Sequence, residues 1–141
     1  MSYARQMLDS HPRILNLDTG VLAAAIDALN DCAQACTADA DADVGEQDVT
    51  KMVRCIRLCL DCADVCTTAV SVSTRQTEYD PRVTMPLLEA CAATCKSCGD
   101  ECERHAQMYE HCRTCAEACR RGEQACRELV AAMKQETARP A

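Results

Sequence analysis

The chain has no phenylalanine or tryptophan and only three tyrosines among its 141 residues. Ordinary aromatic core material is therefore nearly absent, and alanine, leucine, valine and cysteine must fill the interior. Glycine and proline occur only four times each, and this scarcity favours helices over sheet. The length is enough for one domain with a modest core. A core of small residues suits closely spaced helices or a lumen that another species fills.

The sequence also shows no basic patch and no long apolar run, and we expect no secretory leader. The formal net charge is −7, and a phosphate binder needs clustered lysine and arginine, so we expect no nucleic-acid partner. The longest apolar run, 21–26, is too short to span a membrane, so no membrane partner is expected. Residues 1–16 contain no apolar segment typical of a signal peptide. We therefore expect a cytoplasmic protein whose thiols stay reduced.

Cysteine is the abundant feature, with 14 residues at helical spacing. A CxxxCxxCxxxC unit occurs twice, and a third stretch approximates it. At about 100° per residue, each set falls within an arc of about 60° on one helix face. The repeat is consistent with a duplicated helical hairpin. The cysteines are Cys32, Cys36, Cys55, Cys59, Cys62, Cys66, Cys91, Cys95, Cys98, Cys102, Cys112, Cys115, Cys119 and Cys126.

The pattern predicts four long helices with short connections. We expect the first helix from Asp18 or Thr19 to about residue 40, followed by an acidic loop at 39–47. The second runs from about 48 to 75, the third from between 82 and 86 to about 105, and the fourth to about 134. Pro86 sets the third start, because proline is tolerated only in a first turn. Short links between helices predict an all-α, antiparallel up-down-up-down four-helix bundle with a cysteine-lined core.

The expected organisation is an N-terminal arm at 1–17, a four-helix bundle metal-binding domain at 18–134 and a flexible tail at 135–141. Antiparallel packing would bring the four cysteine sets together in one half of the bundle, over about 20 Å of its axis. Soft donors continue the stripe to the open end of this half at Met52, His105, Met108 and His111. Gly122 stands where a cysteine is expected and predicts a gap in the lining. The other half is expected to be lined by Leu22, Ala25, Ala69, Leu88, Leu129 and Met133.

Such a lining suits a soft metal ion. Thiolate, thioether and imidazole are ligands for soft ions, Cu(I) first among them, whereas zinc prefers closed tetrahedral groups. Fourteen buried thiolates would repel one another without cations, and one monovalent ion per thiolate gives a neutral interior. We therefore predict a capacity on the order of one Cu(I) per cysteine. Without metal, protonated thiols would behave as small apolar groups and allow the bundle to fold.

The paired CxxxCxxCxxxC helices and the segment HAQMYEHCRTCAEACRRGEQACR, which starts at His105, resemble the cytosolic branch of the four-helix-bundle copper storage proteins. The resemblance covers about residues 18–134. It implies a core that holds many Cu(I) ions and protects against copper toxicity. It also implies that all fourteen cysteines are ligands, with His105 and His111 near the open end. A homotetramer, and copper donor or acceptor proteins as partners, are implied in the same way.

Other interpretations remain open at this point. A zinc or other soft-metal buffer would use the same thiols, and a metal- or redox-responsive regulator would use fewer ions. Core packing, a disulfide scaffold and an iron–sulfur site are weaker alternatives. We expect no enzyme, because Cys112 and His111 are adjacent on a helix and point about 100° apart. A second apolar line at Ile56, Leu60 and Val70 is a candidate subunit contact, with core packing as the equal alternative.

Overall fold

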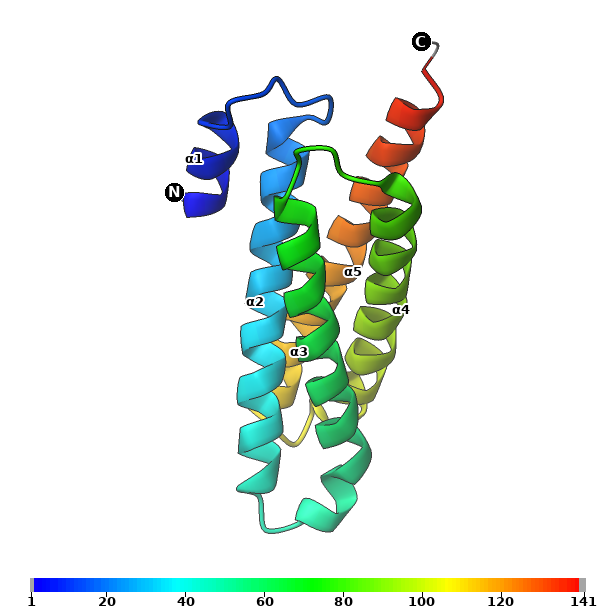
Figure 1. Cartoon of the computed structure of the whole chain (residues 1–141). Coiled ribbons are helices and arrows are strands. Elements are labelled where there is room, and N and C mark those ends of the chain that lie inside the picture. Colours follow the sequence, from blue (N-terminus) through cyan, green and yellow to red (C-terminus); the bar gives the residue numbers. More distant parts are fainter. Residues whose placement is uncertain (1, 140–141) are drawn as a thin grey trace.

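The structure is a computed structural model that describes residues 2–139 and is dominated by four long helices (Figure 1). Across that range, the secondary structure is entirely helical. The prediction of an all-α bundle with a cysteine-rich core is therefore confirmed. The helices are α1 Tyr3–Asp9, α2 Thr19–Val44, the short 3₁₀ helix η1 Val49–Met52, α3 Val53–Thr74, α4 Pro81–His105 and α5 Glu110–Thr137.

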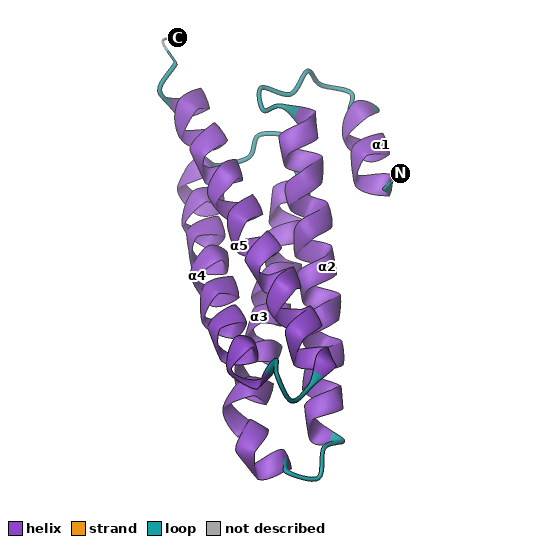
Figure 2. Ribbon diagram, turned by 180° about the vertical axis from the view of Figure 1, so that it is seen from behind, coloured by secondary structure: helices purple, strands orange, loops and turns teal. Residues whose placement is uncertain are grey.

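The four long helices enclose a common axis. Both α2 and α4 pack against α3 and α5. The α2–α3 and α4–α5 connections lie at one end of the bundle, and the α3–α4 connection lies at the other (Figure 1). The view from behind shows α1 outside the bundle, alongside α2 (Figure 2). The N-terminal segment therefore contains a two-turn helix, anchored by the buried side chains of Leu8 and Leu17.

The first long helix begins as predicted and ends later than predicted. Asp18 is the N-cap residue, and its Oδ1 accepts a hydrogen bond from the Val21 N–H at 2.9 Å. The expected loop at 39–47 starts too early, because α2 continues to Val44 and only residues 45–47 of that range lie outside a helix. Asp39 and Asp43 extend the buried face of the helix by one more turn, and both are buried. Burial against the other helices outweighs the weak helix propensity of aspartate here.

The third long helix starts earlier than predicted. Pro81 is its first residue, and Asp80 Oδ1 accepts from the Arg82 N–H at 2.9 Å. Pro86 therefore lies inside the helix, where it leaves one backbone carbonyl without its usual donor. The Pro86 side is exposed, so water can satisfy that carbonyl. At the other end of the chain, α5 runs to Thr137, and residues 140–141 of the expected tail lie outside the described residues.

The bundle interior has two chemically different halves. The half nearer the α3–α4 connection is lined by aliphatic side chains. No helix within residues 2–139 is long and apolar enough to cross a membrane. The other half is lined by sulfur. All four long helices contribute side chains to both halves. The aliphatic half therefore adjoins the sulfur-lined half along the bundle axis and closes it at one end. The aliphatic side chains are those expected, each at most 1% exposed: Leu22, Ala25, Ala69, Leu88, Leu129 and Met133.

Candidate metal centre

All 14 cysteines lie between residues 32 and 126, and all are free thiols. Each side chain is at most 1% exposed. The helical spacing of the cysteines explains this burial, because residues at +4, +3, +4 share the face that each helix turns to the bundle axis. The thiols therefore point inward, as the sequence predicts, and they form no disulfide scaffold.

Sulfur–sulfur contacts join twelve of the 14 thiols, all except Cys112 and Cys126, into one continuous column along the axis. Neighbouring sulfurs are separated by 3.6 to 4.0 Å. Two sulfurs that share a tetrahedral metal ion at about 2.3 Å each would lie about 3.8 Å apart. The column therefore already has the spacing that shared metal ions require. Its links include Cys55–Cys102, Cys102–Cys59, Cys59–Cys98, Cys98–Cys36, Cys36–Cys119, Cys119–Cys32, Cys32–Cys62, Cys62–Cys66 and Cys66–Cys91.

Groups of four sulfurs overlap along the column. In each group the four ligand atoms lie within 4.8 Å of one another. Cys32 and Cys36 each belong to two such groups, so a single thiolate would bridge ions in adjacent groups. Bridging is the property that separates a store for many ions from a set of isolated sites. Three of the groups are Cys32, Cys62, Cys66, Cys95; Cys36, Cys98, Cys115, Cys119; and Cys59, Cys98, Cys102, Cys115.

Contacts between thiols, together with burial, shift the pKa values of individual thiols in opposite directions. Interaction with the Cys119 thiol lowers the pKa of Cys62 to about 7. Interactions with Cys32 and Cys62, together with burial, raise the pKa of Cys95. The thiols therefore differ in how readily each becomes a thiolate.

Two buried carboxylates at the open end were missed by the sequence analysis. Asp39 Oδ2 accepts from the thiols of Cys59 and Cys102, both at 3.4 Å. Asp43 lies one turn further along α2, and its Oδ1 accepts from the Cys112 thiol at 3.6 Å. Burial raises the pKa of Asp39, and it raises the pKa of Asp43 to about 8. Both carboxylates therefore belong to the lining of the metal centre.

A signal for these carboxylates exists in the sequence. Cys32, Cys36, Asp39 and Asp43 have the same +4, +3, +4 spacing as the two complete cysteine units. The first long helix therefore carries a version of the unit in which aspartate replaces the last two cysteines. Reading the stretch as an acidic loop hid this periodicity.

His111 lies against the two aspartates. Its Nδ1 is 2.5 Å from Asp39 Oδ1, and its Nε2 is 3.0 Å from Glu46 Oε1. The same Nδ1 is 3.6 Å from the sulfur of Cys112. Burial alone lowers the pKa of His111, but the hydrogen bonds to Asp39 and Glu46 outweigh it and raise the pKa. The structure thus brings this predicted site residue together with the thiol column.

The other soft donors expected at the open end are placed differently. His105 Nε2 lies 2.9 Å from Glu101 Oε2, so a carboxylate holds this ring. Glu101 is buried, and Arg104 contacts its other oxygen at 3.2 Å. Met52 is buried, as its position on the stripe predicts. Met108 is 74% exposed, so the expectation that it continues the stripe is wrong. It lies between α4 and α5, where the helical periodicity is interrupted.

Gly122 does not leave the expected gap. A Cβ atom at this position would lie 3.1 Å from the sulfur of Cys95 and 3.4 Å from Cβ of Cys32. The thiols of the facing helices therefore occupy the space that a side chain would need. The expectation of a gap fails because it treats each helix separately, whereas the distance between helices adjusts to small residues.

Comparison with known proteins identifies the family. The sequence profile of the copper storage proteins matches residues 19–131. The chain belongs to the copper storage protein family. Among curated sequences, it is 35% identical over 108 residues to the uncharacterised cysteine-rich protein YhjQ of Bacillus subtilis, which covers 77% of this chain and 94% of YhjQ.

Solved structures of other family members share the fold. The copper storage protein Ccsp from Streptomyces lividans, loaded with 10 copper equivalents, is 51% identical with a TM-score of 0.90, covering 92% of this chain and 98% of that chain. A five-copper structure of the same cytosolic protein is 55% identical with a TM-score of 0.78, covering 79% and 93%. The Cu(I)-bound copper storage protein BsCsp3 is 34% identical with a TM-score of 0.68, covering 76% and 95%.

The tight packing around Gly122 yields a testable prediction. Gly122→Ala should destabilise the reduced metal-free protein by about 1 kcal/mol, because overpacking of about 1–3 kcal/mol exceeds the gain in helix propensity. Urea denaturation followed by circular dichroism would measure the change. Gly99→Ala is the matched control, since its Cβ would meet only the flexible guanidinium of Arg120. A Gly122→Ala variant more stable than the parent would show that free space exists there.

Proposed function

We propose that this chain is a cytoplasmic store for copper, which it binds as Cu(I) through the thiolates of the bundle core. The set of 14 buried, free thiols, twelve of which form the continuous column, is the observation that carries the proposal. Storage would lower the concentration of free copper and protect the cell from its toxicity. The role requires no catalytic step, so we propose no enzymatic activity. The cytosolic Streptomyces lividans relative supports the same compartment for this chain.

The donor set favours Cu(I) over zinc in the interior. The spacing of the sulfurs is compatible with either ion, but the balance of charge differs between the two. A zinc ion that uses four unshared thiolates leaves a net charge of −2, whereas one Cu(I) per thiolate leaves none. A buried column of overlapping groups can tolerate only the neutral arrangement, because uncompensated charge in an apolar interior is costly. The Cu(I)-bound relative BsCsp3 supports this choice.

The proposed ligands are the fourteen cysteines, with His111 at the open end. Copper would reach the Cys112 thiol beside His111 and then pass inward by exchange between neighbouring sulfurs, releasing protons as it binds. His105 is held by Glu101, so we assign it a smaller part in loading than His111. Copper donor and acceptor proteins would exchange the ion at this end.

Storage predicts a large capacity. Titration of the reduced protein with Cu(I) in the presence of a competing chromophoric chelator should show that the protein retains on the order of one ion per cysteine, as charge neutrality requires. The Cys98→Ser variant should retain fewer ions, because Cys98 belongs to two sulfur groups. Retention of only a few equivalents would contradict storage and would favour a metal-responsive regulator or a zinc site.

His111 should govern the rate of loading rather than the capacity. In stopped-flow measurements of Cu(I)–thiolate absorbance, His111→Ala should load several-fold more slowly, and His105→Ala should show a smaller effect. The final amplitude should be nearly unchanged in both. His11→Ala is the matched control, because His11 bonds to Thr77 and lies far along the chain from any cysteine. Equal rates in all three variants would remove the histidines from the loading route.

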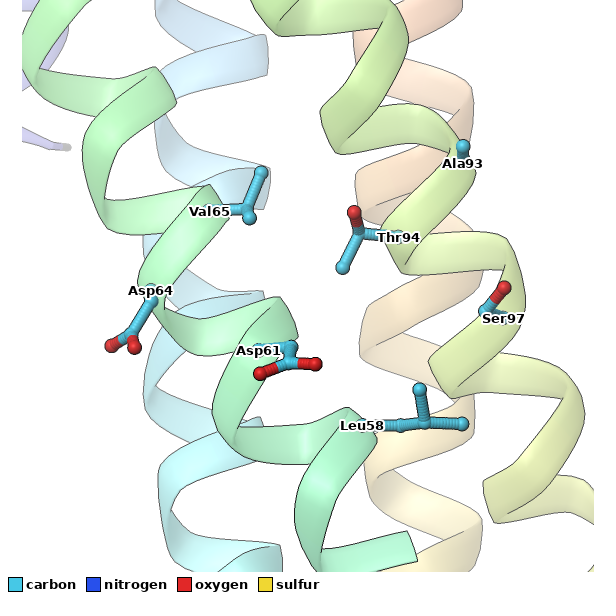
Figure 3. A pocket seen from close by; sticks show the side chains of 7 residues that line it. All are labelled: Leu58, Asp61, Asp64, Val65, Ala93, Thr94 and Ser97. Carbon is cyan, nitrogen blue, oxygen red and sulfur yellow. The ribbon is translucent and has the colours of Figure 1, made fainter. Parts of the chain in front are cut away.

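We also propose that the chain assembles as a homotetramer, as the family resemblance implies. Leu60 is 47% exposed and Val53 is 63% exposed, and seven residues separate them on one face of α3. A separate groove lies between α3 and α4 (Figure 3). Its lining is mixed, with apolar and polar side chains: Leu58, Asp61, Asp64, Val65, Ala93, Thr94 and Ser97. Ile56 and Val70 pack partly against the core, so only Leu60 of the predicted line remains free for a subunit.

Assembly can be tested by the molar mass in solution. Light scattering should give four times the chain mass of 15.4 kDa for the parent protein. The double variant Val53→Glu, Leu60→Glu should dissociate into smaller species, because charges would be buried at the contact. Thr68→Glu, at an exposed position about 80° around the same helix from Leu60, serves as the control. A monomeric parent protein would overturn the tetramer, and an unchanged double variant would place the contact elsewhere.

A further inference from the structure

Nine of the 14 thiols form three separate triangles in which each pair of sulfurs lies 3.6 to 3.9 Å apart. Each triangle joins two cysteines at i and i+4 on one helix with one cysteine of a neighbouring helix. The i, i+4 spacing supplies one edge, and the packing of the helices supplies the other two. The triangles are Cys32, Cys36, Cys119; Cys62, Cys66, Cys95; and Cys98, Cys102, Cys59.

Each triangle has the size of a three-coordinate site. An atom at the centre of a triangle with edges of 3.6 to 3.9 Å lies about 2.2 Å from every corner, close to the zinc–thiolate distance of about 2.3 Å. The three sulfurs can therefore bond one atom with little movement of the helices. No sulfur belongs to two of these triangles, so each triangle can hold its own atom without a bridging ligand.

The charge of three thiolates selects the valence of that atom. A monovalent ion in one triangle leaves a net charge of −2 and a divalent ion leaves −1, whereas a trivalent atom leaves none. All nine side chains are fully buried, and net charge in such an interior is costly. Arsenic(III) meets the requirement, because it is trivalent, prefers sulfur and forms three bonds to it with a lone pair in the fourth position.

We propose that the reduced, metal-free chain binds three arsenic(III) atoms, one in each triangle, as a second cargo beyond the proposed storage of copper. Arsenous acid, As(OH)3, is uncharged at neutral pH, so it enters an apolar interior without the desolvation cost of an ion. At each site As(OH)3 reacts with three thiols to give As(SR)3 and three water molecules. Three As–O and three S–H bonds break, three As–S and three O–H bonds form, and no atom changes its oxidation state.

The number of bound arsenic atoms and their neighbours test the proposal. Non-denaturing mass spectrometry of the metal-free protein in excess arsenite should show three additions, each of one arsenic atom less three hydrogens. A phosphine keeps the protein reduced, because a small thiol in the buffer would bind arsenite itself. Arsenic X-ray absorption should show three sulfur neighbours and no oxygen. The copper-loaded protein should take up no arsenic, because its thiolates are already occupied.

Cys119→Ser should bind two arsenic atoms, because one triangle loses a corner. Cys126→Ser is the matched control and should bind three, since Cys126 is a buried cysteine of the same helix that belongs to none of the triangles. Circular dichroism reports whether each variant folds. Absence of binding, arsenic that keeps oxygen neighbours, or equal numbers in the two variants would overturn the proposal. Cu(I) retention is measured separately on the parent protein, so failure of copper storage is distinguishable from failure of arsenic binding.

Discussion

The close approach of buried sulfurs from four helices is the constraint on which the rest of the structure depends. Sulfurs 3.6 to 4.0 Å apart leave room only for small side chains on the inward faces of the four long helices. The absence of phenylalanine and tryptophan from the core is consistent with this restriction. Because protonated thiols are small and nearly apolar, the interior can pack without metal. The aliphatic half supplies conventional burial at the other end. The division of the bundle into two halves therefore separates folding from metal binding.

The chemistry of the interior changes from the mouth inward. Asp39, Asp43 and His111 offer oxygen and nitrogen at the open end, while the deeper groups offer sulfur alone. A carboxylate that accepts S–H hydrogen bonds, as Asp39 does from Cys59 and Cys102, also links the two zones. Ions would therefore meet progressively softer ligands as they move along the axis. This order favours retention of Cu(I), which prefers thiolate, over harder cations.

Helices were predicted well from the sequence where hydrophobic or cysteine periodicity was used. Helix ends were predicted poorly where local composition was used instead. The cysteine spacing located the interior faces of α3, α4 and α5, and Asp18, one of the two expected start residues, caps α2. The acidic stretch after Cys36 was taken for a loop because aspartate is a weak helix former. Its +4, +3, +4 spacing carried the better information. Pro86 misled in the same way, since an exposed proline is tolerated inside a helix that tertiary packing stabilises.

The sequence by itself determined which side chains face the interior and that they are soft metal ligands, because helical periodicity fixes the face of each residue within its own helix. Only the tertiary structure decided which groups from different helices meet. It placed Asp43 against Cys112 and His111, turned His105 toward Glu101, exposed Met108 and closed the space at Gly122. These outcomes depend on the distance and axial register between helices, and no local pattern within one helix specifies either.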